Sequence, residues 1–179
     1  MKKVIKVIIA MCLCMGLLAG CQNAKEDKSP EKEEYADEAF LKDLSKALEA
    51  RWDVANAEFK DAKEQKDNFQ ESVETEFEIL KGYDKKEFED SNLKDLSSQY
   101  LSCLKKQEDS LKYYGMDTDK YQELWDEAYN TRTKILAQLK EDYGFKVSEK
   151  YKSIFDEMME NAKHVPESEE KSNLTIDEQ

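Results

Sequence analysis

The stretch Ser91–Gly144, SNLKDLSSQYLSCLKKQEDSLKYYGMDTDKYQELWDEAYNTRTKILAQLKEDYG, decides the fold. Two apolar stripes run through it at steps of three and four residues, the spacing of one helix face. Each stripe ends at a glycine, Gly115 or Gly144, where a helix commonly ends in a left-handed residue. The stretch therefore predicts two helices, the first capped by Ser91 and the second starting at Asp117 or Thr118.

Helical spacing also precedes this stretch, over residues 37–81, where no glycine or proline interrupts the chain before Gly82. This segment could be one long helix or two. The charged patch Lys63–Asn68 has the weakest apolar face, so we expect a kink or break there. The expected stripe consists of Phe40 or Leu41, Leu44, Leu48, Trp52, Ala55, Phe59, Ala62, Phe69, Val73, Phe77 and Leu80.

A last helix is expected after Gly144, with Ser148 as its cap and with Phe145 and Val147 closing the core at the turn. Its inward residues would be Tyr151, Ile154, Phe155, Met158 and Ala162. Short connections at 115–117 and 144–147 force neighbouring helices to be antiparallel. Runs that alternate apolar and polar residues, which indicate strands, are missing. The sequence thus predicts an all-α, up-and-down bundle of four to five helices over residues 37–163.

The N-terminal residues 1–20 have the pattern of a secretory signal. Lysines 2, 3 and 6 precede the apolar run 7–18, which as a helix would rise only about 18 Å, short of a membrane's hydrocarbon core. The run leads into Leu18-Ala19-Gly20-Cys21. In this context the four residues resemble the lipobox of bacterial lipoproteins. The alternative is an ordinary secretory signal followed by a chance cysteine.

The lipobox resemblance implies cleavage between Gly20 and Cys21 and attachment of acyl chains, such as palmitate, to Cys21. The protein would then be held at the extracytoplasmic face of the cell membrane. Residues 21–36 would be the lipidated cysteine and a flexible linker, and residues 164–179 a disordered acidic tail. The two prolines of the chain, at 30 and 166, lie outside the expected bundle.

The chain is acidic, and loss of the signal would make it more so. The full sequence has 28 lysines and arginines against 41 acidic residues, and removal of three signal lysines leaves 25 against 41, a net charge of −16. Nucleic acid is therefore not expected as a partner. An acidic surface also disfavours flat binding to anionic lipid, so the acyl chains would do the holding.

Residues for catalysis or metal binding are scarce. His164 is the only histidine and lies where the last helix should end, and Cys103 lies beside a stripe and is expected in the core. No cofactor or metal site is expected, because Zn²⁺ needs several such ligands. The carboxylates Glu74, Glu76 and Glu78 alternate and are expected to splay around a helix. The protein is not expected to be an enzyme, although a cell-envelope hydrolase using paired carboxylates is the alternative.

Aromatic residues are the best candidates for a binding site. The sequence has two tryptophans, nine tyrosines and seven phenylalanines, most of them on the stripes. Any excess over what a small bundle can bury would mark a partner site. The candidates are Trp52, Tyr113, Tyr114, Trp125 and Tyr129, with Arg51 beside Trp52 expected to pair with a carboxylate or stack.

A second resemblance covers most of residues 37–145. The stretches Phe40–Asp53, Asp90–Leu101 and Trp125–Arg132 and the Lys112-Tyr-Tyr triplet are similar to small helical lipoproteins of Gram-positive bacteria. No activity is assigned to that group, so the resemblance implies export and helicity and carries over no catalytic residue. Together, these patterns predict a lipid-anchored protein with a non-catalytic binding or scaffolding domain. Its partner would be an envelope protein or a peptide.

Overall fold

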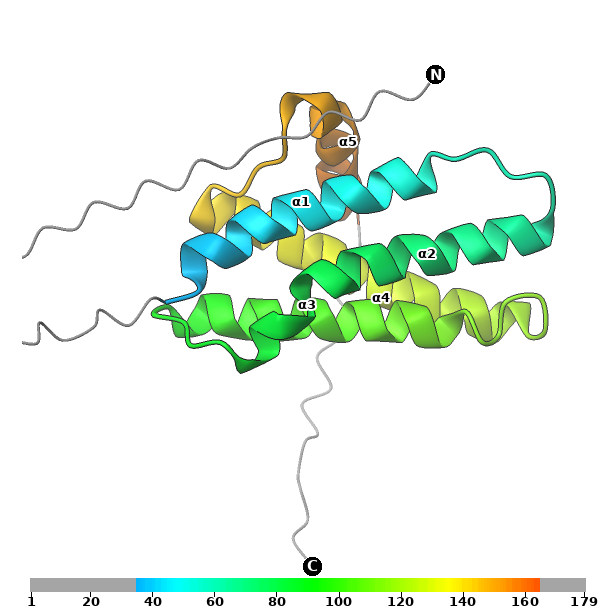
Figure 1. Ribbon diagram of the computed structural model, residues 1–179, viewed down its shortest axis with the longest axis horizontal. Coiled ribbons are helices and arrows are strands. Elements are labelled where there is room, and N and C mark those ends of the chain that lie inside the picture. The colour runs from blue at the N-terminus through cyan, green and yellow to red at the C-terminus, as the bar shows by residue number, and fades with distance from the viewer. Residues whose placement is uncertain (1–34, 165–179) are drawn as a thin grey trace, which may run out of the picture. The chain divides into compact units, whose positions relative to one another are not determined.

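The computed structural model describes residues 35–164, which fold into five α-helices and two short 3-10 turns (Figure 1). Several expected segments lie outside the described residues. They are the signal with its cleavage site at Gly20 and Cys21, nearly all of the linker, and the tail beyond His164. The α-helices are α1 (Asp37–Ala55), α2 (Ala62–Leu80), α3 (Ser91–Ser110), α4 (Thr118–Tyr143) and α5 (Lys152–Ala162). The 3-10 turns are η1 (Lys81–Lys85) and η2 (Glu149–Tyr151).

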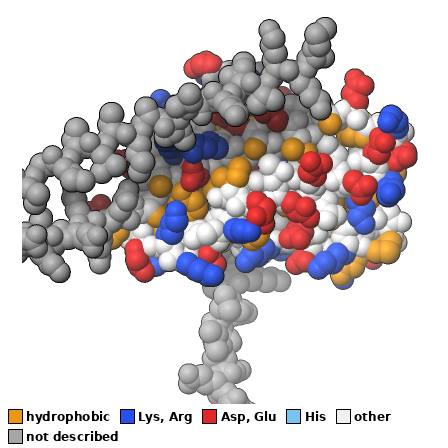
Figure 2. Space-filling view, viewed as in Figure 1, with side chains coloured by type: hydrophobic (Ala, Val, Ile, Leu, Met, Phe, Trp, Pro, Cys, Tyr) orange, Lys and Arg blue, Asp and Glu red, His pale blue; other side chains and the backbone are white. Residues whose placement is uncertain are grey.

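The helices form two antiparallel hairpins, α1 with α2 and α3 with α4, and α5 runs across them (Figure 1). No strand occurs among residues 35–164, and none of the helices there has the length and apolar character needed to cross a bilayer. The predicted all-α, up-and-down bundle is thus confirmed. On the face seen in Figure 2, acidic and basic side chains are interspersed, with hydrophobic ones between them.

Aspartates start three of the helices by accepting hydrogen bonds from free backbone N–H groups of the first turn. Asp61 accepts from Lys63 and Glu64, both at 2.9 Å. Asp90, rather than the expected Ser91, caps α3.

Asp117 caps α4 as expected, through a 3.0 Å bond from the Lys120 N–H. Gly144 ends α4 in the left-handed region at φ 65°, and Gly115 has φ 76°. Gly82 also follows a helical stretch, which would favour a left-handed residue there as at Gly115 and Gly144, but it lies inside the 3-10 turn η1 and lacks a positive φ. The chain there continues with a tightened turn, so no left-handed residue is needed.

The break between the first two helices lies at 56–61, not at the expected Lys63–Asn68. Residues 63–68 are helical because Asp61 supplies the N-cap that starts α2 just before them. Phe59 falls in the connection and is 42% exposed, so its expected place on the inward stripe was wrong. Residues 37–81 therefore form two helices that lie antiparallel.

The main core is apolar and continuous. Its largest fully buried members include Phe40, Leu44, Leu48, Leu93 and Leu136. Ala36, assigned by sequence to the linker, is 4% exposed and donates its N–H to the Glu87 carbonyl at 2.9 Å. Cys103 is buried as expected, and burial raises the pKa of its thiol to about 11.

The last helix packs differently from the expected pattern. Phe145 is buried and Val147 partly buried, which closes the core at the turn as predicted. Ser148 precedes η2 but makes no side-chain cap bond. Because η2 has a tighter turn than an α-helix, it changes the helical phase, and Ile154 is left 37% exposed while Met159 is buried.

Candidate functional site

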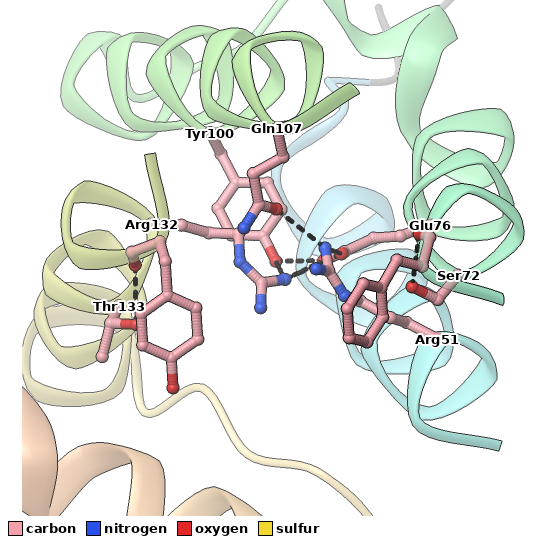
Figure 3. Close-up of polar contacts among 9 residues, drawn as sticks. Arg51, Ser72, Glu76, Tyr100, Gln107, Arg132 and Thr133 are labelled. Atoms are coloured by element: carbon pink, nitrogen blue, oxygen red, sulfur yellow. Dashed lines mark hydrogen bonds and ion pairs between the residues drawn. The ribbon is translucent and has the colours of Figure 1, made fainter. Parts of the chain in front are cut away.

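Five polar side chains from all four bundle helices meet inside the protein and form what we call the charged cluster (Figure 3). They are Arg51 of α1, Glu76 of α2, Tyr100 and Gln107 of α3, and Arg132 of α4. All five are buried, the most exposed being Arg51 at 6%. Charges are rarely buried this completely unless they are paired.

Glu76 is the centre of the charged cluster. Its Oε2 accepts from Arg51 Nη1 at 2.6 Å, and Arg132 Nη1 lies 2.8 and 2.7 Å from its two oxygens. The Tyr100 hydroxyl donates to Oε1. Burial alone would raise the pKa of Glu76, but the charges of Arg132 and Arg51 outweigh burial and hold it below its usual value.

The cluster therefore carries a surplus positive charge. Arg51 and Arg132 each retain a proton, because a guanidinium is not deprotonated in proteins. Burial raises the pKa of Tyr100 well above its ordinary value, so its hydroxyl stays neutral. Two cations against one carboxylate leave a net charge of +1.

The cluster also has more hydrogen-bond donors than acceptors. Each guanidinium offers five N–H groups, yet the bonds that Arg51 and Arg132 donate to residues 35–164 all come from Nη1. Within that range, the buried Arg132 Nε and Gln107 Nε2 find no acceptor. The two oxygens of Glu76 are already occupied by its three partners.

A groove of about 320 Å³ opens beside the cluster, between α1, α4 and α5. Arg51 and Arg132 line it at the bundle side. Its other lining residues are Trp52, Trp125, Tyr129, Ile154, Glu157, Met158 and Asn161. A hollow of this size, with aromatic walls and a few polar groups, has the character of a small-ligand site.

The structure brings together three of the five aromatic residues predicted from sequence, Trp52, Trp125 and Tyr129. Trp52 is 9% exposed and packs against Tyr151 with ring centroids 5.6 Å apart. Trp125 and Tyr129 are partly exposed, and the Arg51 guanidinium carbon lies 6.0 Å from the Trp125 ring centroid. This distance permits a cation–π attraction.

Tyr113 and Tyr114 lie outside the groove. The Tyr114 ring packs edge-on against Tyr121 at 5.0 Å, and its hydroxyl donates to Gln65. Tyr113 lies under the Lys120 ammonium at 4.4 Å. Tyr114 and Tyr121 belong to a chain of ring contacts, which we call the aromatic end, formed by Phe59, Phe69, Tyr114, Tyr121 and Trp125.

Two other hollows are larger but hold no buried charge. One, of about 540 Å³, lies over α2, η1 and α3 beside Phe77 and Leu101, and the other, of about 640 Å³, lies between α4 and α5. Their charged lining residues lie on the surface. Among residues 35–164, no set of three or more histidine, cysteine or acidic side chains is placed to hold a metal ion.

The sequence reasoning missed most of the charged cluster. Glu74, Glu76 and Glu78 do splay around α2 as expected, with Glu74 and Glu78 exposed, but the alternation alone did not indicate that Glu76 is the one that is fully buried. The signal was its position, three residues after Val73 and four before Leu80 on the inward stripe. Gln107 and Arg132 also stand on the apolar stripes of their helices, and the pairing of Arg51 with a carboxylate is confirmed.

No protein-family model, curated protein or solved structure matches the chain.

Proposed function

We propose that the chain is a lipid-anchored protein of the extracytoplasmic membrane face, in a Gram-positive bacterium, and that its helical domain is a non-catalytic binding module. The anchor rests on one observation, the Leu18-Ala19-Gly20-Cys21 stretch after a basic and then apolar segment. Acyl chains on Cys21 would supply the attachment to the membrane. Two or more chains anchor stably, whereas one holds only marginally.

The binding half of the proposal is supported by the groove between α1, α4 and α5. Its arginines are fixed by Glu76 and donate hydrogen bonds without exchanging protons. Glu76 is occupied by three partners, and its lowered pKa makes it a poor proton donor at neutral pH. This arrangement favours recognition over acid–base chemistry.

The anchor is tested by fractionating cells that express the full chain or its Cys21→Ala variant. We expect the unchanged chain in the membrane fraction, labelled by radioactive palmitate. The variant should lose the label and leave the membrane or accumulate unprocessed, and globomycin should block processing of the unchanged chain. Palmitate labelling of the variant, or processing of the unchanged chain that globomycin does not block, would contradict the lipid anchor.

The binding module is tested by placing a photo-crosslinking amino acid at the groove. Ile154 lines the groove and is 37% exposed, while Ile79 on α2 is 38% exposed and lies outside the groove, which makes it a matched control. We expect a discrete crosslinked product in living cells from position 154 and none from position 79. Equal labelling from both positions would argue against the groove as the binding face.

A further inference from the structure

We infer that the groove beside the charged cluster binds a small organic molecule through a single carboxylate, with the flat apolar body of that molecule lying against Trp52, Trp125 and Tyr129. The inference rests on the proposed binding function and names the ligand class. It is carried by the surplus of charge and donors at Arg51 and Arg132, next to aromatic walls.

The charge of the site selects an anion. Arg51 and Arg132 line the groove, and Glu76 neutralises only one of them. The remaining charge lies among buried groups, where water screens it little. Of the other groove residues only Glu157 is acidic, and it lies exposed on α5, where solvent weakens its effect.

The donors of the site select a planar acceptor. A guanidinium presents its N–H groups in a flat fork that matches a carboxylate. Arg51 and Arg132 each carry five N–H groups, but every bond that they donate within residues 35–164 comes from Nη1. A net charge of +1 is balanced by a monoanion, so a carboxylate fits better than a phosphate dianion.

The aromatic lining and the volume of the groove limit the shape and size of the remainder of the ligand. Trp125 and Tyr129 are partly exposed, and Met158 and Ile154 complete an apolar side. Aromatic faces of this kind favour a flat apolar partner. A groove of about 320 Å³ lies at the small end of the usual range for ligand sites.

The test measures binding to the full chain, purified in a non-ionic detergent, by isothermal titration calorimetry. The probes are phenylacetate, its uncharged isostere phenylacetamide, and inorganic phosphate. We expect phenylacetate to bind at least tenfold more tightly than phenylacetamide, and phosphate not to compete. Equal binding of acid and amide would overturn the carboxylate assignment, as would competition by phosphate or no binding of phenylacetate.

Two variants locate the site. Arg51→Met leaves Glu76 paired with Arg132 and should reduce phenylacetate affinity at least tenfold without changing that of phenylacetamide. Arg51→Lys keeps the charge and should retain the preference for the acid. If Arg51→Met does not fold, as judged by circular dichroism, the acid–amide comparison on the unchanged chain still decides. Crosslinking from position 154 in cells combined with no phenylacetate binding would refute the ligand class and leave the binding function standing.

Discussion

The two ends of the bundle are built on different principles, and the charged cluster separates them. At one end, the start of α1 and the end of α4 enclose an apolar core in which Phe40, Leu44 and Leu139 are fully buried. At the other, the aromatic end covers the bundle with rings that remain partly exposed. Val73 and Leu111 are buried on this side but do not belong to the main apolar cluster.

The difference shows where stability and recognition reside. An apolar core lowers the free energy of folding in proportion to its buried area. A buried ion cluster contributes little net stability but is costly to break. Large aromatic rings that stay accessible are typical of binding surfaces. We therefore expect the apolar end to carry stability and the groove at the cluster to carry recognition.

The largest effect should come from breaking the cluster at its centre. Glu76→Gln leaves Arg51 and Arg132 buried together without a counter-charge, and should lower the free energy of unfolding by about 3–5 kcal/mol. Urea denaturation followed by circular dichroism measures this. Glu74→Gln, on the exposed face of the same helix, is the control and should change stability by less than about 0.5 kcal/mol. Equal effects of the two variants would refute the central role of Glu76.

The next effect should come from the apolar end. Leu44 is fully buried, so Leu44→Ala should cost about 2–5 kcal/mol through lost burial and the remaining cavity. Phe59 at the aromatic end is 42% exposed, and Phe59→Ala should cost less than about 1 kcal/mol despite removing a larger side chain. The same denaturation measurement compares them. If Phe59→Ala lowered the free energy of unfolding more than Leu44→Ala, the apolar end would not be the main source of stability.

A smaller, graded effect should follow acidification. The folded-state pKa of Glu76 is lowered, so its contribution is fully present above about pH 4.5 and is lost as the pH falls through the folded-state value. In that window stability should fall by up to about 1.4 kcal/mol per pH unit from this group. Glu76→Gln lacks this group, so the stability gap between the two proteins should narrow. A gap independent of pH would contradict the lowered pKa.

The smallest effect concerns the turn at the apolar end. Gly144 has φ 65° and open space around its Cβ position, so Gly144→Ala should cost about 1–2 kcal/mol through backbone strain alone. Gly82 also has open space but no positive φ. Gly82→Ala should therefore be neutral or stabilise by up to about 1 kcal/mol. Thermal unfolding of both variants checks the opposite signs.

The apolar end could be predicted from sequence, whereas of the charged cluster only the pairing of Arg51 with a carboxylate was predicted. Leu44, Leu48 and Leu136 follow helical spacing, which fixes their inward faces without knowledge of their partners. The burial of Glu76 and Arg132 can be explained only once α2 and α4 are packed together, because each side chain supplies the counter-charge for the other. These two residues are 56 positions apart in the sequence, so no pattern of neighbouring residues indicates that they pair.

The aromatic residues of the groove could be predicted in part. Aromatic residues beyond the needs of a small core pointed to Trp125 and Tyr129, and these do line the groove. Tyr113 and Tyr114 carry the same signal, but the turn after Ser110 directs them away from it. The weak apolar face of residues 63–68 predicted the wrong place for the break between α1 and α2. The better signal was Asp61, an N-cap residue that starts α2 just before them.

The attachment of the first helix has a mechanical consequence. Ala36 donates its N–H to Glu87, and the Asp37 carboxylate accepts from the N–H groups of Glu89 and Asp90 at 2.9 and 3.0 Å. A pulling force on the chain ahead of Ala36 meets these three bonds first. The bonds transmit the force to residues 87–90, just before α3, so α1 is not unwound turn by turn. Bonds loaded together yield at a higher force than bonds that open in sequence, so the start of α1 resists a force applied to the chain ahead of Ala36.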